Sequence, residues 1–549
     1  MSSRFAQPHA GTISTRSLII DAGTLPAVAV FGGLVLLAVL MRPLLAVDET
    51  RYFSVAWEMW QDSSFLVPHL NGEAYSHKPP LLFWLINVAW YLFGTDSIVA
   101  RLVAPAFGML SIWLTARLAR RLWPDDHDSA RLAPWILATT GAFLLLGSLT
   151  AFDAMLSSAT LLALTGILLA RRSQDYRAWL VVGLGMAFGG LAKGPVILLH
   201  VLPVALLLPV WAERSTRPAL GRWYAGIALS LLTAIAIVAV WLVPALQAGG
   251  PEYQTDILWR QHAGRVVDAF AHQRPFWFYL AGLPLLTWPW TWSRRVLGSL
   301  TSKRMRVDEG LRFCIAWAVA ALFLFSLSAG KQMHYLLPEL PAVALLVARA
   351  GYGSRAKSRG EAIGRPYVGL ALPALLLLAG LAVSLGLSPA LAGKDLLMPA
   401  NSVIGASAVL AGLLLLVLRL HSRLASWALL APALLLMVHL LADPVLHRAY
   451  DPSAIGRHLA VFESQGIAIA YSDYDGEFTY AGRLTRPLGV LRDDAAVAAW
   501  TAGHPGGAII TRKMIDDPSL RQFGSYNYRG RIYYLFEVDN TSVGARQKK

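Results

Sequence analysis

The chain has 549 residues, of which 56% are hydrophobic and only 15% are charged, and its mean hydropathy is +0.50. These values exclude an ordinary soluble globular protein and indicate a polytopic α-helical membrane protein. A net charge of +15 with a pI near 10.0 is typical of nucleic-acid binding, but the basic residues gather in short segments between apolar runs, so we expect no nucleic-acid partner.

The first apolar run covers residues 25–47 and follows a basic segment, residues 1–24. The run is too long, and begins too far into the chain, to be the core of a cleaved signal peptide, so we expect a retained helix. Excess Lys and Arg marks cytoplasmic segments, which predicts a cytoplasmic N-terminal tail over residues 1–24. Directly after the run the chain carries Asp48, Glu49 and Arg51.

About thirteen apolar runs are long enough to span a membrane, and with thirteen spans every basic cluster falls on the cytoplasmic side. The predicted spans are 25–47, 97–117, 132–149, 154–170, 178–192, 195–211, 223–243, 276–293, 312–329, 334–349, 366–388, 402–418 and 424–441. The apolar run 79–93 is short, and counting it would turn the basic clusters outward. We therefore interpret it as an interfacial or re-entrant helix within an outer loop, residues 48–96.

This topology places the polar residues that the apolar runs do not explain on one outer face. They are Asp48, Glu49, Arg51, Lys78, Asp153, Lys193, Arg260, His262, Arg265, Lys331, His334 and Tyr335. Positive charge is depleted on the outer side of such proteins, so basic residues there require a specific reason. The residues 25–443 are thus predicted to form one transmembrane domain with a charged outer site.

The outer basic residues suit a phosphate or pyrophosphate group, which Arg binds bidentately. The cations are Arg51, Lys78, Arg260, Arg265 and Lys331, and Tyr52, Tyr75 and Tyr335 add hydroxyl donors. A phosphate at headgroup level with its lipid tail between helices is what a polyprenyl phosphate carrier offers. Carboxylates beside such a cluster would act on an acceptor, bind a divalent metal, or hold the basic side chains in place.

Taken singly, each of these residues also has a structural interpretation. A basic side chain at a membrane boundary extends towards lipid headgroups, Asp48 and Asp153 could cap helices, and Lys193 could belong to a kinked corner with Gly194 and Pro195. The outer histidines match no known metal-ligand spacing. Their joint occurrence on one face favours the functional interpretation.

The residues 444–549 read as a small α/β domain on the outer side. The segments 466–472, 507–513 and 531–538 have strand character, and 493–503 suits a helix. Nothing in this part looks catalytic, so we expect a lid or a platform for an acceptor. The single Cys314 lies within a predicted span, which excludes an intramolecular disulfide.

Several motifs resemble the bacterial aminoarabinose transferase family. D-E-x-x-Y at 48–52, P-H-L-N-G at 68–72 and H-K-P-P-L at 77–81 resemble its first outer loop, together with Glu58-Met59. AFDAML at 151–156, GLAKGP at 190–195 and SAGKQMHYLLPELP at 328–341 follow in the same order. The resemblance covers about residues 46–340, and the family is related to the protein O-mannosyltransferases of the GT-C superfamily.

The resemblance implies an inverting GT-C glycosyltransferase of the bacterial inner membrane, with its site facing the periplasm. Such enzymes move 4-amino-4-deoxy-L-arabinose from undecaprenyl phosphate to lipid A phosphate, a modification that gives resistance to polymyxin and other cationic peptides. Asp48 matches the catalytic acidic position, and Glu49 and Asp153 are further catalytic candidates. The candidates for holding the carrier phosphate are Lys78, Arg51, Tyr52, Tyr75, Arg260, Lys193, Lys331 and Tyr335. No cofactor is required, although a divalent metal stays open. Asp48→Asn should abolish transfer, and Glu49→Gln should be milder.

Other functions stay open at this stage. Another polyprenyl phosphate sugar transferase, such as a protein O-mannosyltransferase, would use the same cations but needs a base for a hydroxyl acceptor. A secondary transporter should place ionisable groups near the midplane, whereas the predicted spans are nearly free of charge and Arg42 and Arg101 lie close to span ends. A non-enzymatic lipid-binding protein would leave the carboxylates without a role.

Overall fold

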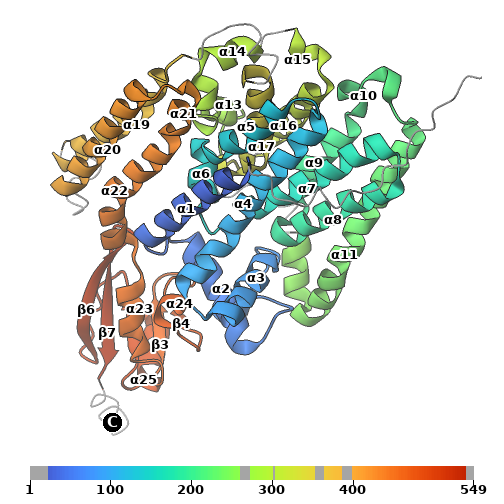
Figure 1. Ribbon diagram of the computed structural model, residues 1–549. Helices are drawn as coiled ribbons and strands as arrows, with labels where there is room; N and C mark the ends of the chain where they lie inside the picture. The colour runs from blue at the N-terminus through green and yellow to red at the C-terminus, as the bar shows by residue number, and fades with distance from the viewer. Residues whose placement is uncertain are drawn as a thin grey trace, which may run out of the picture.

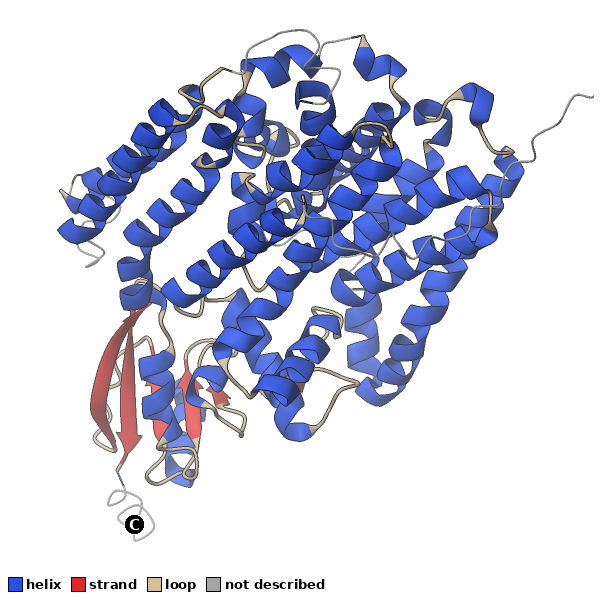
Figure 2. Ribbon diagram, viewed as in Figure 1, coloured by secondary structure: helices blue, strands red, loops and turns tan. Residues whose placement is uncertain are grey.

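The computed structural model describes residues 23–259, 273–300, 303–352, 364–385, 387 and 399–539. Most of the chain forms a bundle of helices. A sheet near the C-terminal end lies near α2 (Asp48–Asp62) and α3 (Leu81–Phe93) at the lower edge of Figure 1, and its strands are red in Figure 2. Short helices in or next to the predicted basic turns lie at the opposite end of the bundle; they are α10 (Leu208–Trp211), α14 (Arg294–Leu300) and α15 (Arg304–Val307).

Within the described residues, seven helical stretches are long and apolar enough to cross a membrane, or eight if one bent pair counts as a span. They are α4 (Ser97–Leu122), α7 (Phe152–Ser173), Tyr176–Leu206, Leu220–Trp259, α16 (Glu309–Leu327), α20 (Ala400–Arg419) and Arg423–Ala460. The bent pair is α5 (His127–Ala138) with α6 (Gly141–Gly147), at 57°. The chain is therefore a multi-pass helical protein.

The remaining predicted spans are shorter, broken or longer than expected. α1 (Leu25–Met41) ends six residues before the predicted end of its span, at position 47, and α19 (Ala371–Ser384) is also short. The run 276–293 is broken between α13 (Phe278–Leu286) and η5 (Trp290–Trp292). In contrast, α11 (Leu220–Thr255) continues well past residue 243.

The other elements of the bundle are α8 (Tyr176–Lys193), η2 (Gly194–Val196), α9 (Ile197–Leu206), α10 (Leu208–Trp211), η3 (Arg214–Thr216), α14 (Arg294–Leu300), α15 (Arg304–Val307), η6 (Met333–Glu339), α17 (Leu340–Leu346), η7 (Val347–Tyr352) and η8 (Val368–Leu370).

Helix α7 is the central helix of the bundle. Of its most apolar window, 89% is buried, compared with 28% for α11. Small residues at its contacts let neighbouring backbones come close. For example, Gly185 of α8 packs against Ala163 of α7, and a Cβ at Gly185 would lie only 2.6 Å from the backbone nitrogen of Ala163. This tight packing fixes the first turn of α7, which carries Asp153.

The outer loop folds as helix, hairpin and helix. α2 (Asp48–Asp62) ends at Ser63 in the left-handed conformation, and β1 (His69–Leu70) pairs with β2 (Glu73–Ala74). The turn Asn71-Gly72 has positive φ at both residues, as a two-residue hairpin turn requires. The run predicted as an interfacial helix forms α3 (Leu81–Phe93).

The C-terminal part contains a five-stranded mixed sheet of order β4-β3-β5-β7-β6. The strands are β3 (Ile467–Ala470), β4 (Gly489–Leu491), β5 (Ala508–Thr511), β6 (Leu520–Tyr528) and β7 (Arg531–Val538), with helices α23 (Ser453–Ala460), α24 (Thr479–Gly482) and α25 (Asp494–Gly503). β3 is parallel to β4 and β5, and β7 is antiparallel to β5 and β6. α21 (Arg423–Ala428) leads into α22 (Leu430–Tyr450), which runs through the predicted domain boundary at 443/444.

Candidate functional site

The first turn of α7 and the end of α8 bring a buried carboxylate and an ammonium together. Asp153 Oδ1 lies 2.6 Å from Lys193 Nζ, and both side chains are about nine-tenths buried or more. His334 Nε2 lies 3.9 Å from the other carboxylate oxygen of Asp153. A charged pair at this depth is stable only because the partners compensate each other. Lys193 is therefore engaged with Asp153, which reduces its availability to a phosphate.

Aromatic rings separate the cations of the site. Lys78 Nζ lies 5.8 Å from the ring centroid of Phe152, and Lys193 Nζ lies 4.7 Å from that of Tyr335. The ring of Tyr52 meets Phe152 edge-on at 4.9 Å. Since a cation over an aromatic face is attracted by the ring quadrupole, Phe152 helps to position the ammonium group of Lys78 and Tyr335 that of Lys193.

Asp48 begins α2 and points to solvent, with its side chain 70% exposed. Arg51 Nη1 lies 3.9 Å from Asp48, and Arg51 Nη2 lies 2.8 Å from Asp475, which precedes α24. Burial raises the pKa of Tyr52, and the negative charges of Asp48 and Asp153 add to this effect. Both carboxylates therefore lie within electrostatic reach of the Tyr52 hydroxyl.

We define the outer charge cluster as Asp48, Arg51, Lys78, Asp153 and Lys193. Its members come from α2, the segment before α3, α7 and α8. Tyr75 packs beside it, because its ring lies 6.1 Å from Phe83, whose ring lies 5.9 Å from that of Phe152 at the start of α7. The cluster joins exposed and buried charges of both signs, an arrangement that can bind a phosphate and a cationic group together.

Glu49 lies outside this cluster, in a second ionic arrangement. Its carboxylate accepts hydrogen bonds from Arg42 Nη2 at 3.1 Å, the Thr150 hydroxyl at 2.7 Å and the Leu45 backbone N–H at 3.0 Å. Arg101 Nε lies 3.6 Å away and donates through its other nitrogens to the carbonyls at the end of α1. The catalytic role expected for Glu49 finds no support in this geometry.

We define the Glu49 network as Arg42, Glu49, Arg101, Ser148 and Thr150. Arg42 also donates to the carbonyl of Ser148 at 2.7 Å. Burial alone would raise the pKa of Glu49, but the charges of Arg42 and Arg101 outweigh it and hold the pKa below its ordinary value. The network ties α1, α2, α4 and the segment before α7 together, so it positions Asp48 without reaching solvent.

The other predicted phosphate ligands are placed differently from one another. Lys331 is buried and donates to the carbonyls of Arg274, at 3.0 Å, and Ser328, so it closes a turn instead of facing the cluster. Tyr335 packs against Lys193 and His334 at the cluster. Arg260, with His262 and Arg265, lies outside the described residues.

Two residues of the site escaped the sequence analysis in different ways. His334 was among the unexplained outer residues, but no pattern paired it with Asp153. Asp475 gave no signal, because it reaches Arg51 only through the folding of the C-terminal part against α2. In the part of the chain that the structure describes, no group of three or more His, Cys, Asp or Glu residues is close enough to hold a metal ion.

Known proteins match this chain over most of the bundle. Residues 77–243 match the family model described as dolichyl-phosphate-mannose-protein mannosyltransferase. Proteins named undecaprenyl phosphate-alpha-4-amino-4-deoxy-L-arabinose arabinosyl transferase are 29% identical over 334 residues in Erwinia tasmaniensis, 32% over 349 in Pseudomonas aeruginosa and 31% over 388 in Pectobacterium carotovorum. These matches cover 58%, 60% and 69% of this chain and 58%, 60% and 66% of the relatives.

A solved structure also shares the fold of this chain. The crystal structure of ArnT from Cupriavidus metallidurans bound to undecaprenyl phosphate superposes with a TM-score of 0.72, covering 94% of this chain and 98% of that one at 18% identity. The resemblance to the aminoarabinose transferases is confirmed. The crystal structure of the same Cupriavidus metallidurans ArnT in the apo state superposes equally well, with a TM-score of 0.73. The chain therefore has the helical GT-C fold of ArnT. The chain spans about three fifths of the length of the first curated relatives that it matches.

Proposed function

We propose that this chain is an inverting glycosyltransferase that moves 4-amino-4-deoxy-L-arabinose from undecaprenyl phosphate to a phosphate of lipid A. The observation that carries the proposal is the outer charge cluster, which lies at one end of an aminoarabinose transferase fold. Lys78 and Arg51 supply positive charge from the outer loop, while Asp48 leaves an exposed carboxylate beside them.

In the proposed reaction an oxygen of the lipid A phosphate attacks the anomeric carbon as the bond to the carrier phosphate breaks. Attack from the face opposite the leaving group inverts the anomeric configuration, and the bonding electrons leave with undecaprenyl phosphate. Lys78 and Arg51 stabilise the negative charge that develops on this leaving group. The acceptor phosphate is already ionised, so no proton needs to be removed from it and a strong general base is unnecessary.

Asp48 then has an orienting role. The 4-amino group of the sugar is cationic near neutral pH, and the exposed carboxylate of Asp48 is suited to pair with it. Asp153 is compensated by Lys193 and is almost fully buried, so we assign it to positioning the surrounding cations. Lys193 is correspondingly a positioning residue, and Lys331 is not assigned to the carrier phosphate. We keep Tyr52, Tyr75 and Tyr335 as donors near the phosphate.

We further propose thirteen spans, with the outer charge cluster and the C-terminal α/β domain in the periplasm of a bacterial inner membrane. The proposal rests on the basic turns, which lie at the end of the bundle opposite α2 and α3 (Figure 1). A reporter that works only in the periplasm should be active when it is fused after Ser63. A reporter that works only in the cytoplasm should be active when it is fused after Asp125 or Arg214. The reverse pattern would overturn the proposed orientation.

The activity is tested by expressing the chain in a Gram-negative strain that lacks its own aminoarabinose transferase. Mass spectrometry of lipid A should show phosphate groups carrying 4-amino-4-deoxy-L-arabinose, together with polymyxin resistance. Unmodified lipid A, with the chain present in the membrane at normal level, would count against the proposal. Glycosylated Ser or Thr in periplasmic proteins would instead support the mannosyltransferase-like alternative, which the family model raises.

A further inference from the structure

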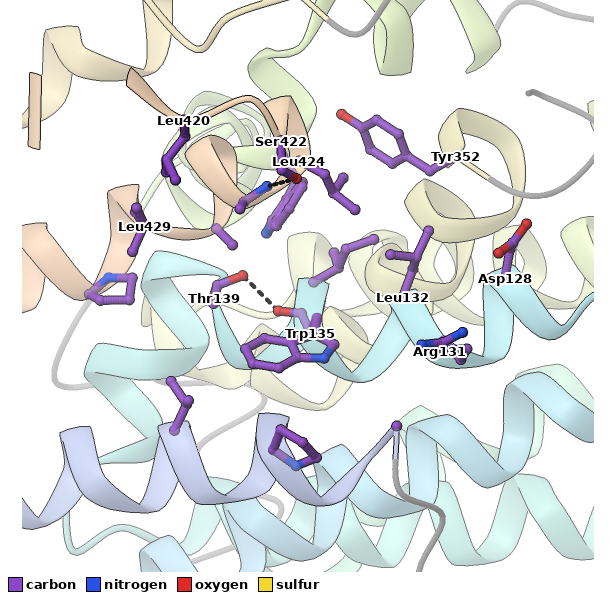
Figure 3. A pocket seen from close by; sticks show the side chains of 18 of the residues that line it. Asp128, Arg131, Leu132, Trp135, Thr139, Tyr352, Leu420, Ser422, Leu424 and Leu429 are labelled. Carbon is purple, nitrogen blue, oxygen red and sulfur yellow. Dashed lines mark hydrogen bonds between the residues drawn. The ribbon is translucent and has the colours of Figure 1, made fainter. Parts of the chain in front are cut away.

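A cavity of about 1040 Å³ lies between the start of α1, α5 and the α21–α22 segment (Figure 3). No member of the outer charge cluster lines it. Its size matches that of the largest ordinary ligand sites, which are about 1,000 Å³. The cavity is therefore a second place where this chain can hold a molecule, separate from the proposed reaction.

The walls of this cavity are mostly apolar. The start of α1, α5 and the α21–α22 segment supply most of them, and the apolar lining includes Pro26, Val30, Leu132, Trp135, Ile136, Leu424, Leu429 and Pro432. An apolar hollow in the side of a membrane helix bundle accommodates hydrocarbon without leaving polar backbone groups unsatisfied. The walls therefore suit an acyl chain.

Charged side chains line the cavity at the beginning of α5 and in α14. Arg131 is exposed, and a Cβ at Gly23 would lie 3.4 Å from its Cγ, so the absence of a side chain at Gly23 leaves room for the Arg131 stem. Arg295 donates from Nε to the carbonyl of Gly351 at 2.7 Å, and its guanidinium lies 5.7 Å from the ring centroid of Tyr352. The guanidinium of Arg295 is thus held against the wall, whereas Arg131 lines the cavity with an exposed side chain.

The charge balance of the lining favours an anion. Two arginines oppose one carboxylate, Asp128. Close by, Arg349 pairs with Asp126 at 2.5 Å and Asp308 at 2.9 Å, and none of these three lines the cavity. The exposed residues Arg294 and Arg423 flank lining residues in sequence and add further positive charge.

The position of the cavity identifies the membrane leaflet. It is lined by residues from three of the basic turns, around positions 131, 295 and 422, which the distribution of Lys and Arg assigns to the cytoplasmic side. Anionic headgroups at that surface attract basic side chains. A lipid there would place its phosphate at the arginines and an acyl chain over Trp135 and Leu132.

We propose that this cavity is a binding site for one anionic glycerophospholipid of the cytoplasmic leaflet, with the phosphate held by Arg131 and Arg295. The inference does not depend on the sugar-transfer activity proposed above. It concerns the opposite end of the bundle and would stand if the substrate were different.

The test uses the full chain, purified in detergent, delipidated and titrated with phosphatidylglycerol, with native mass spectrometry to count bound lipids. Phosphatidylethanolamine with the same acyl chains is the comparison lipid. We expect one phosphatidylglycerol to bind with clear preference. Arg131→Gln with Arg295→Gln should weaken that binding by about fivefold for each charge removed, and Arg131→Lys with Arg295→Lys should largely keep it.

Two further variants separate this site from general surface charge. Arg177→Gln with Arg214→Gln removes the same charge from two exposed positions in basic turns that supply no residue to the cavity lining, and should leave binding of the one tightly held phosphatidylglycerol unchanged. Ala428→Phe keeps every charge but narrows the apolar part of the cavity, and it should weaken binding of the lipid. Equal binding of both lipids, equal losses in both arginine pairs, or binding that appears only after residues 1–22 are removed would each overturn the proposal.

Discussion

Asp48 and Glu49 are neighbours in the sequence, yet they belong to two different regions of the molecule. Successive side chains on a helix point about 100° apart, so α2 directs Asp48 to solvent and Glu49 into the bundle. In the Glu49 network the carboxylate is matched by two guanidinium groups and a hydroxyl, all buried. The outer charge cluster instead leaves Asp48 exposed. Burial and pairing, more than residue type, distinguish a structural charge from one available to a substrate.

The largest expected effect comes from opening the Glu49 network. Glu49→Gln leaves the guanidinium groups of Arg42 and Arg101 buried without a counter-charge, which typically costs about 3 to 5 kcal/mol. We expect a large loss of thermal stability in detergent and less protein in the membrane. The milder effect expected from the sequence concerned sugar transfer, whereas this prediction concerns stability. A melting temperature equal to that of the wild type would show that the network is not structural.

Asp48→Asn should reduce sugar transfer and leave stability nearly unchanged, in contrast to Glu49→Gln. The amide keeps the shape of the side chain but lacks the charge proposed to hold the sugar's amine, so we expect transfer to fall by about 100- to 1,000-fold. Stability and carrier binding should stay near wild type, because Asp48 is exposed. Transfer to lipid A, measured by mass spectrometry, decides the matter. Near-wild-type transfer would return Asp48 to a purely structural interpretation.

Lys78→Ala should act on the carrier. Loss of one charged hydrogen bond costs about 1.5 to 3 kcal/mol, so binding of undecaprenyl phosphate should weaken by about ten- to a hundredfold. Lys78→Arg should restore part of it. Arg492→Ala, which removes a highly exposed cation from the C-terminal part, is the matched control and should bind normally. Equal affinities for Lys78→Ala and the control would remove Lys78 from the site.

The pH dependence of stability gives the smallest effect. The pKa of Glu49 is lowered in the folded state, so its stabilising contribution is complete above the ordinary value of 4.5 and is lost as pH falls through the lower folded value. The stability difference between wild type and Glu49→Gln should therefore stay constant from pH 7 to 5 and shrink only in stronger acid. A difference that shrinks already above pH 5 would contradict the proposed ionisation of Glu49.

The sequence predicted those features that depend on local pattern. Alternating and apolar runs correctly placed β3, β5, β7 and α25, and the short apolar run correctly gave α3. The sequence analysis also grouped Asp153 with Lys193, and these two side chains lie 2.6 Å apart in the structure. Periodicity and charge sorting contain this information without any knowledge of tertiary contacts.

Features that depend on distant partners could not be predicted in this way. The inward orientation of Glu49 depends on Arg101, more than fifty residues later, and the sequence analysis saw that arginine only as a charge near a span end. Lys331 satisfies backbone carbonyls instead of facing the cluster, which no spacing reveals. Helix ends also differ from the predicted spans, as in α11, which continues past residue 243 with a kink at Gly250.

The contact between α2 and the C-terminal part has a consequence for the order in which the protein is made. Ser54 donates to the carbonyl of Gly476 at 2.6 Å across 422 residues of sequence, and Trp57 donates to Leu484 at 2.8 Å across 427. Arg51 takes its partner Asp475 from the same late segment. The ribosome therefore synthesises α2 near the start of translation and its partners, residues 475–484, near the end. Until the C-terminal part has folded and docked on α2, a partly synthesised chain lacks the carboxylate of Asp475 that pairs with Arg51, which delays assembly of the complete site until translation is nearly over.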